Sequence, residues 1–201
     1  MNPVEASASS AEKILLAATD LFAANHFNGV SIKEIAKKSG VNSALISYYF
    51  GGKKNLYQEV LNEQSNLFLN LIARVSSKDI APLAKLREYI TAISEVQKLH
   101  PHRIHLIYRE LLTPTFMCDS FIKNRLYKIH KFMSELVTEA IADGSIRNNM
   151  QPTHVAFTLE SIIVFFFLTH DQIRDLGHFE NGTEITYLEE ALNTYLSSIT
   201  N

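Results

Sequence analysis

Lysine and short polar side chains gather in one part of this 201-residue sequence, between residues 31 and 54. Five lysines stand there against one acidic residue, Glu34, which gives the segment a charge of +4. Residues 61–201 carry 13 basic and 16 acidic side chains, a balance of −3. A basic segment on an acidic body suggests a surface that meets polyanions. Charge alone leaves open the alternative that the lysines only solvate a helical face.

A second group with possible chemistry is the cluster of His100, His102 and His105, with Glu110 nearby. His102 and His105 lie three residues apart on one helix face, a spacing that can bind a metal. The alternative is a polar helix start near a domain junction, and no cysteine or second histidine pair supports a metal site. We expect neither a metal nor a cofactor.

Catalytic motifs are missing from the sequence. It contains no nucleophile elbow, no Gly-rich phosphate loop and no metalloprotease motif. The single cysteine, Cys118, excludes an internal disulfide framework, and its neighbour Asp119 disfavours a thiolate. We expect a protein that is not an enzyme.

The cellular compartment is predicted from two features. Residues 1–10 are small and polar, so a signal peptide is not expected. The longest purely apolar run, Ile162–Leu168, is much shorter than the ~18 residues of a membrane span. These features predict a cytoplasmic protein without a membrane segment.

The elements that position these residues are predicted to be helices. Ser9-x-x-Glu12 and Ser31-x-x-Glu34 are capping boxes that begin the first two helices, and Gly40 ends the second. Asn42 can cap a third helix that runs to about Phe50, before the break at Gly51-Gly52. Six further helices are expected at about 53–75, 82–99, 101–112, 119–142, 152–174 and 185–199. The sequence therefore predicts an all-α fold of about nine helices, without strands or internal repeats.

The second and third helices, joined by a tight glycine turn, form a helix-turn-helix, whose last helix enters the DNA major groove. Residues Ile14–Leu61 resemble the DNA-binding domain of the tetracycline-repressor (TetR) family. The matching motifs are Ala17-Ala18-x-x-Leu21-Phe22, Val30-Ser31-Ile32-x-x-Ile35-Ala36-x-x-x-Gly40-Val41, and Tyr48-Tyr49-Phe50 followed by Lys53-x-x-Leu56. The match covers about a quarter of the chain, and the rest agrees only in helix layout. The resemblance implies a DNA-binding domain at 1–52 and a ligand-binding and dimerisation domain at 53–201.

The resemblance also implies roles for single residues. Ser31 and Lys53 would hold DNA phosphates, and the hydroxyls of Tyr48 and Tyr49 could reach the backbone, although one ring could instead pack under its helix. The residues expected to face the bases are Asn42, Ser43, Ala44 and Ser47. The alternative, that the segment only packs a three-helix bundle, is accepted for its apolar residues: Ile35, Ala36, Val41, Leu45, Ile46 and Phe50.

Two departures from the family pattern matter. Gly51-Gly52 stands where the family often has a Ser or Asn cap, so the joint before the fourth helix is expected to be more flexible. The recognition helix lacks Arg, Gln and Lys, so bidentate reading of guanine is not expected from it. Small side chains, Asn42 and DNA shape would have to supply specificity.

The run Ile162–Leu168 is apolar all round, and such a helix must be covered on more than one side. One side can be the chain's own core and the other a partner subunit, and the resemblance implies a dimer made by the last two long helices. The alternative is a buried central helix of a monomer. The expected interface residues are Ile162, Phe166, Leu188, Leu192 and Tyr195.

Aromatic and aliphatic residues of the C-terminal part could line a mostly apolar small-molecule cavity, with Arg125 as anchor for an anion. The candidates are Tyr89, Ile93, Tyr108, Leu112, Phe121, Arg125, Phe132 and Phe165. The alternative is that they pack a core. Together these features predict a homodimeric one-component transcription repressor that binds a palindromic double-stranded operator and is released by a small-molecule effector. A non-specific architectural DNA-binding protein would be much more basic than the net charge of −2.

Overall fold

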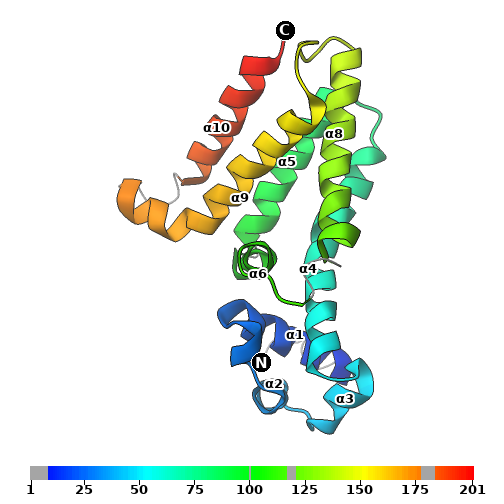
Figure 1. Cartoon of the computed structure of the whole chain (residues 1–201), viewed down its shortest axis with the longest axis vertical. Coiled ribbons are helices and arrows are strands. Elements are labelled where there is room, and N and C mark those ends of the chain that lie inside the picture. Colours follow the sequence, from blue (N-terminus) through cyan, green and yellow to red (C-terminus); the bar gives the residue numbers. More distant parts are fainter. Residues whose placement is uncertain (1–8, 100, 117–120, 178–183) are drawn as a thin grey trace. The chain divides into compact units, whose positions relative to one another are not determined.

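The computed structural model of the chain describes residues 9–99, 101–116, 121–177 and 184–201. In this part the chain forms nine α-helices, and its only β feature is an isolated antiparallel bridge between Ile146 and Thr200. Figure 1 shows the helices in chain order. The predicted all-α fold is confirmed.

The N-terminal helices begin and end where the local signals place them. Helix α1 spans Ser10–Ala24 and α2 spans Ile32–Ser39, separated by a 3-10 turn at Phe27–Gly29. Both capping boxes form, because the serine side chain and the glutamate three residues later each accept a backbone N–H. Gly40 ends α2 in the left-handed region, with φ 69°.

The third helix, α3, spans Ala44–Phe50, and Asn42 caps it as predicted. The Asn42 Oδ1 atom accepts the backbone N–H of Ala44 at 2.9 Å, while Ser43 already has helical dihedral angles. Gly51 and Gly52 follow with φ of 70° and 120°. These two positive φ values give the joint a defined conformation that residues with a Cβ adopt at a cost, so the glycines do more than add flexibility.

The remaining helices are α4 (Lys53–Ser76), α5 (Pro82–Leu99), α6 (Pro101–Leu112), α8 (Tyr127–Ala142), α9 (Pro152–Gly177) and α10 (Glu184–Ile199). A π-helical turn at Ile122–Leu126 precedes α8, so the predicted regular helix at 119–142 changes its winding there. Gly144 follows α8 with φ 82°, in the left-handed region that favours glycine after a helix. Residues 178–183, between the two last predicted helices, and the cysteine at 118 lie outside the described residues.

Contacts divide the chain into two compact units. The first comprises Met1–Asn66 and His100–Phe121, and the second comprises Leu67–Leu99 and Ile122–Asn201. Helix α6 therefore groups with the N-terminal helices, and α4 contributes to both units. The domain boundary at residue 52 stays a prediction.

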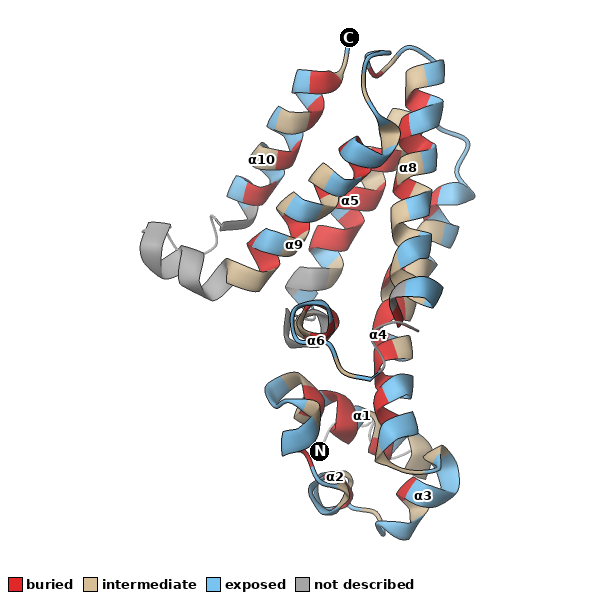
Figure 2. Ribbon diagram, viewed as in Figure 1, coloured by how far each residue is buried: buried red, intermediate tan, exposed pale blue. Residues whose placement is uncertain are grey.

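Each unit has its own apolar core, shown in red in Figure 2. In the first unit the most buried residues include Ile14, Phe22, Ile35, Ile46, Leu56 and Leu106. In the second unit they include Leu86, Met133, Val155, Leu159 and Leu188. Ile35, Ala36 and Ile46 are buried as predicted, whereas Val41, Leu45 and Phe50 are only half-buried.

Candidate nucleic-acid interface

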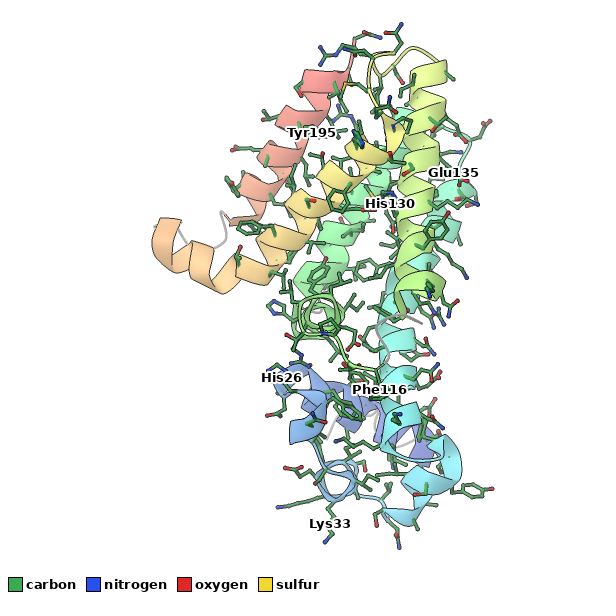
Figure 3. All side chains as sticks on the ribbon, viewed as in Figure 1. His26, Lys33, Phe116, His130, Glu135 and Tyr195 are labelled. Carbon is green, nitrogen blue, oxygen red and sulfur yellow. The ribbon has the colours of Figure 1, made fainter. Side chains whose placement is uncertain are left out.

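The polar residues of the helix-turn-helix lie on the surface of the first unit. Ile46, with no exposed surface, anchors α3 to the core, whereas the predicted DNA-facing residues are all exposed apart from the half-buried Lys53. The exposed ones are Ser31, Asn42, Ser43, Ala44, Ser47, Tyr48 and Tyr49. Figure 3 labels Lys33 on the neighbouring helix α2, where it also points outward. The surface of α2 and α3 is thus free to contact a ligand as large as DNA.

Tyr48 and Tyr49 project from the end of α3. Their exposed fractions are 79% and 47%, and their rings contact each other edge-on with centroids 5.0 Å apart. Neither ring packs under the helix, so both hydroxyls are accessible. Both tyrosines therefore remain candidates for contacts with the DNA backbone.

Ser31 already makes hydrogen bonds within the protein. Its Oγ atom accepts the backbone N–H of Glu34 at 3.2 Å, and its own N–H donates to Glu34 Oε2 at 2.7 Å. Hydrogen bonds from the Ser31 side chain and from its backbone N–H to the carboxylate lower the pKa of Glu34 below its ordinary value and keep a negative charge at the start of α2. To donate to a phosphate, the Ser31 hydroxyl would have to exchange Glu34 for it, whereas the first-turn N–H groups of α2 other than that of Glu34 have no acceptor within the helix.

Two lysines at the start of α4 lie over aromatic rings. Lys53 Nζ is 4.2 Å from the ring centroid of Phe27, and Lys54 Nζ is 4.2 Å from that of Phe116. Partial burial lowers the pKa of Lys53, and nearby Glu34 works in the opposite direction. The sequence identified Lys53 but neither ring, because both contacts depend on tertiary structure.

A buried polar network, missed by the sequence analysis, joins α4, α6 and the turn that follows α6. Glu110 is 1% exposed, and its Oε2 atom accepts the hydroxyl of Tyr57 at 2.8 Å. Its Oε1 atom accepts the backbone N–H and the hydroxyl of Thr115, at 3.0 and 2.6 Å. Burial raises the pKa of Tyr57 well above its ordinary value, and the hydrogen bond to Glu110 adds to this rise. Both carboxylate oxygens of Glu110 are therefore engaged within the protein.

Arg109 links the same helix to α1. Its guanidinium donates to the main-chain carbonyl oxygens of Phe22 and Ala23, in the last turn of α1. Carbonyl groups at a helix end lack intrahelical donors and attract cations. Burial lowers the pKa of Arg109, while Tyr57 and Glu110 oppose that change.

The histidine cluster is described only in part. His100 lies outside the described residues, and nothing is described of the His102 side chain. Glu110 accepts hydrogen bonds from Tyr57 and Thr115. Among the described residues, no group of histidine, cysteine and acidic side chains is placed to hold a metal ion.

The predicted ligand-pocket residues divide between the two units. Within the second unit, Tyr89 and Phe132 pack edge-on with ring centroids 5.0 Å apart, and Ile93 is buried, while Arg125 lies half-buried in the π-helical turn. Tyr108 and Phe121 are buried and belong to the first unit. Leu112 and Phe165 are 67% and 64% exposed. These last two are wrong as lining of a closed cavity, because their helices turn them outward.

The predicted dimer residues lie on two different faces. Phe166, Leu188 and Leu192 are buried within the protomer and pack in its own core. Their prediction as interface residues is therefore wrong. Ile162 and Tyr195 are half-buried. Among the described side chains of α9 and α10, the large apolar ones that are exposed are instead Phe157, Phe165 and Tyr187. Along α10 a hollow of about 500 Å³ is lined by Tyr187, Glu190, Ala191, Thr194, Tyr195 and Ser198.

Helix α9 is also long and apolar enough, by length and composition alone, to cross a membrane. Its window Pro152–Thr169 has a mean hydropathy of 1.5 and is 33% buried. The uninterrupted apolar run Ile162–Leu168 is only part of this window, whose other residues include polar side chains. A helix that packs against its own core on one side and a partner on the other has the same composition.

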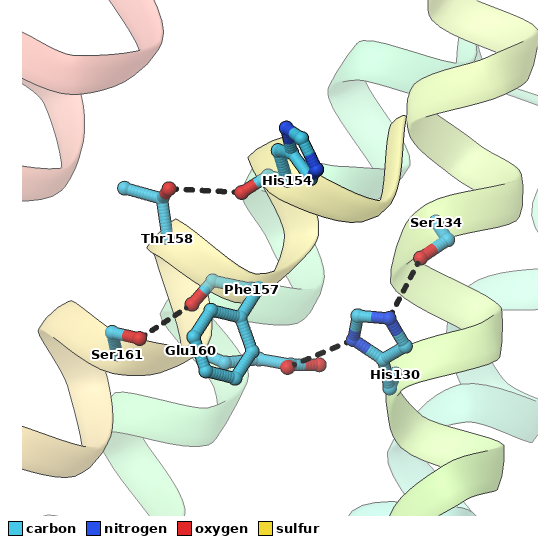
Figure 4. A network of polar contacts seen from close by, with 7 residues as sticks. All are labelled: His130, Ser134, His154, Phe157, Thr158, Glu160 and Ser161. Atoms are coloured by element: carbon cyan, nitrogen blue, oxygen red, sulfur yellow. Dashed lines mark hydrogen bonds and ion pairs between the residues drawn. The ribbon is translucent and has the colours of Figure 1, made fainter. Parts of the chain in front are cut away.

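A polar contact network ties α8 to α9 in the second unit. His130 Nδ1 lies 3.0 Å from Glu160 Oε2, and its Nε2 atom lies 3.5 Å from Ser134 Oγ, as Figure 4 shows. A carboxylate, an imidazole and a hydroxyl follow one another in the same order in the catalytic triad of serine hydrolases. Here, however, the hydroxyl lies one turn along the same helix, at the limit of hydrogen bonding. Burial raises the pKa of Glu160, and His130 partly offsets this.

Comparison with known proteins agrees with this arrangement. Residues 14–60 match the bacterial regulatory proteins of the tetR family. The chain is 30% identical over 146 residues to the HTH-type transcriptional regulator RutR of Escherichia coli K12, and the matched region covers 73% of this chain and 68% of RutR. It is 30% identical over 157 residues to the HTH-type transcriptional repressor NicS of Pseudomonas putida, covering 77% and 74%.

A solved structure extends the similarity to the fold. AibR, in complex with isovaleryl coenzyme A and operator DNA, superposes with a TM-score of 0.69 at 25% identity, covering 79% of this chain and 86% of AibR. The exposed helix-turn-helix of the first unit and the all-α second unit fit the same pattern. The chain therefore belongs to the tetR family of bacterial regulatory proteins, whose members bind operator DNA and respond to small-molecule ligands.

Proposed function

We propose that this chain is a homodimeric transcription repressor that binds a palindromic operator and is released by a small-molecule effector. The observation that carries the proposal is the exposed polar face of α3, next to the two lysines that lie over aromatic rings at the start of α4. Such a protein acts in the cytoplasm, on double-stranded DNA, and needs no catalysis. NicS, which is named a repressor, supports the direction of control.

Backbone contacts fix the register of the protein on DNA. Lys53 and the first turns of α2 and α4 offer a positive charge and free N–H groups to phosphates, and the hydroxyls of Ser31, Tyr48 and Tyr49 can donate. These contacts supply affinity that falls with salt concentration.

Base recognition is assigned to the exposed face of α3. Ser43, Ala44 and Ser47 are small, so the helix can lie deep in the major groove and contact thymine methyl groups or base edges. Asn42 uses its Oδ1 atom for the cap, which leaves its amide N–H groups for a base acceptor. Asn42 thus has both a structural and a recognition role.

The dimer is proposed to form through the outer faces of α9 and α10. Phe157, Phe165 and Tyr187 are exposed apolar groups there, and the hollow along α10 can receive side chains of a second copy. A two-fold dimer would place two α3 helices in successive major grooves of a palindrome, ~34–36 Å apart.

An effector is proposed to bind in the second unit, where Tyr89, Ile93, Arg125 and Phe132 remain the candidate contacts. Isovaleryl coenzyme A accompanies operator DNA in the AibR structure, which supports a joint response to a small molecule and DNA. The effector must bind better to a conformation that fits the operator poorly. A coupling of about 1–3 kcal/mol, or roughly 5- to 150-fold in operator affinity, is the expected scale.

The DNA proposal is tested by titrating operator and random duplexes at several salt concentrations. Lys53→Ala should weaken binding to all sequences and reduce the slope of log affinity against log salt by about one. Ser47→Ala should instead change the preferred sequence. Lys128→Ala, an exposed lysine of α8, is the matched control. Unchanged affinity and slope for Lys53→Ala would show that this surface does not meet the DNA backbone.

The dimer proposal is tested by light scattering of Phe165→Glu. This residue is 64% exposed, so the charge should leave the protomer folded but separate the subunits and weaken operator binding. Tyr127→Glu, at a 60% exposed site on α8, should stay dimeric. A Phe165→Glu protein that remains a dimer at micromolar concentration would contradict the proposed interface.

A further inference from the structure

The rings that hold Lys53 and Lys54 come from two distant parts of the chain. Phe27 lies in the turn between α1 and α2, and Phe116 lies in the turn after α6. Their ring centroids are 5.1 Å apart, and each ring has one lysine ammonium 4.2 Å from its centroid. Figure 3 labels Phe116 within the first unit, next to α4.

Both rings are held by buried partners. Phe27 packs against Tyr57 and Phe22, with centroid distances of 5.0 and 6.0 Å. The position of Phe116 follows from its neighbour Thr115, whose N–H and hydroxyl both donate to the buried carboxylate of Glu110. The same carboxylate accepts the hydroxyl of Tyr57, on the helix that carries the lysines. The aromatic pair and the start of α4 are therefore fixed to one another.

An aromatic face differs from a carboxylate as a partner for lysine. A carboxylate would neutralise the ammonium group and compete with phosphate for it. The ring quadrupole attracts the ammonium group but leaves its charge uncancelled, and the group keeps N–H donors for a second partner. A lysine held in this way is ordered in advance and loses less side-chain entropy when it contacts phosphate.

We infer that Phe27 and Phe116 are positioning residues for DNA binding, which hold Lys53 and Lys54 by cation–π contacts in place for the phosphate backbone. This inference rests on the proposed DNA-binding function and deepens it. It adds Lys54 to the backbone contacts. It also brings the turn after α6 into the DNA-binding surface, although this turn lies outside the helix-turn-helix sequence at 14–60.

The experiment uses Phe116, which is 46% exposed and can be replaced without opening the core. Phe116→Leu keeps an apolar side chain but removes the ring, whereas Phe116→Tyr keeps the ring. Operator affinity is measured at several salt concentrations for both variants, for Lys54→Ala, and for Phe116→Leu combined with Lys54→Ala. Leu112→Ala, at a 67% exposed site of α6, is the control for substitution near this turn. Thermal unfolding of each variant establishes that it is folded.

We expect Phe116→Leu to weaken operator binding about 2- to 5-fold, the equilibrium factor of one exposed cation–π contact. Phe116→Tyr and Leu112→Ala should match the wild type. In the Lys54→Ala background, Phe116→Leu should have no further effect, because the ring acts through that lysine. Equal weakening with and without Lys54 would overturn the inference, since the ring would then act through the fold.

The two proposals fail in different ways. If Lys54→Ala weakens binding and Phe116→Leu does not, the positioning role is overturned and DNA binding at this surface stands. If Lys53→Ala and Lys54→Ala both leave affinity and salt slope unchanged, the DNA surface itself is misplaced.

Discussion

Replacing Tyr57 by phenylalanine removes one oxygen atom from the centre of the first unit. The ring stays in its edge-on contact with Phe22, at a centroid distance of 4.9 Å, so no cavity opens. The loss is the hydrogen bond from the Tyr57 hydroxyl to Glu110 Oε2. Because Glu110 is 1% exposed, water cannot replace the donor without rearrangement.

The expected magnitude follows from the charge of the acceptor. A hydrogen bond to a charged group contributes about 1.5–3 kcal/mol, and a buried acceptor without its donor carries its full desolvation cost. Thr115 still donates twice to the other carboxylate oxygen, which limits the damage. We expect Tyr57→Phe to lower the free energy of unfolding by about 2 kcal/mol.

The pH dependence provides a second signature. Burial raises the pKa of folded Tyr57 above its ordinary value of 10.0. A group whose pKa is raised on folding stabilises the protein below its unfolded pKa, and this stabilisation is lost as the pH rises towards the folded pKa. The stability difference between wild type and Tyr57→Phe should therefore be constant below about pH 9 and shrink above about pH 10.

Urea unfolding monitored by circular dichroism measures both signatures. The midpoint should fall by about 1 M with an unchanged m-value. Tyr127→Phe, which removes a hydroxyl from a 60% exposed ring, should leave the midpoint unchanged. An unaltered midpoint for Tyr57→Phe, or an equal loss in both variants, would refute the role assigned to the buried hydrogen bond.

Two further substitutions probe other parts of the fold. Gly51→Ala should cost about 1–2 kcal/mol of unfolding free energy, because a Cβ at φ 70° is strained and would lie 3.0 Å from Asn55 Nδ2; Gly29→Ala, whose Cβ would meet nothing closer than 3.9 Å, should be nearly neutral in the same urea titration. Glu160→Gln tests the raised pKa of Glu160. The wild type should gain stability relative to the variant as the pH falls through that raised pKa towards 4.5, by about 1.4 kcal/mol for each pH unit that separates the folded pKa from the unfolded one. A stability difference that does not change with pH would contradict a buried carboxylate with a raised pKa.

The helix boundaries were predictable because their signals are local. A capping box joins residues three apart, so Ser9 and Ser31 identify the starts of α1 and α2 without any knowledge of the fold. Gly40 and Gly51 end their helices for the same reason, since the left-handed conformation is a property of the single residue. The exposed face of α3 follows from helical periodicity once the boundaries are known.

The buried network was not predictable because its partners are far apart in sequence. Tyr57 and Glu110 are separated by 53 residues, and nothing near either one indicates the other. An all-round apolar segment also gives no sign of which side faces the protomer's own core. Phe165 and Phe166 are neighbours, yet one is 64% exposed and the other 2%. The π-helical turn at Ile122–Leu126 is a comparable case. Such a turn contains more residues than an α-helical turn, so the residues that follow it face inward at positions that a regular 3.6-residue period does not predict.

The basic segment at 31–54 illustrates how much a partner changes the meaning of a charge. The sequence counts its five lysines alike, but Lys38 lies 3.2 Å from Asp20 in an exposed ion pair, whereas Lys53 and Lys54 lie over rings. The ion pair contributes little to stability, and at distances beyond its own length its two charges largely cancel. The rings cancel none of the charge at the start of α4, because an aromatic ring has no net charge to oppose the ammonium group, and only Lys53 also has a carboxylate, that of Glu34, acting on it. A net charge of −2 is therefore compatible with DNA binding. The count along the sequence finds the segment that meets the polyanion, and the partner of each lysine decides which charges the phosphate backbone encounters.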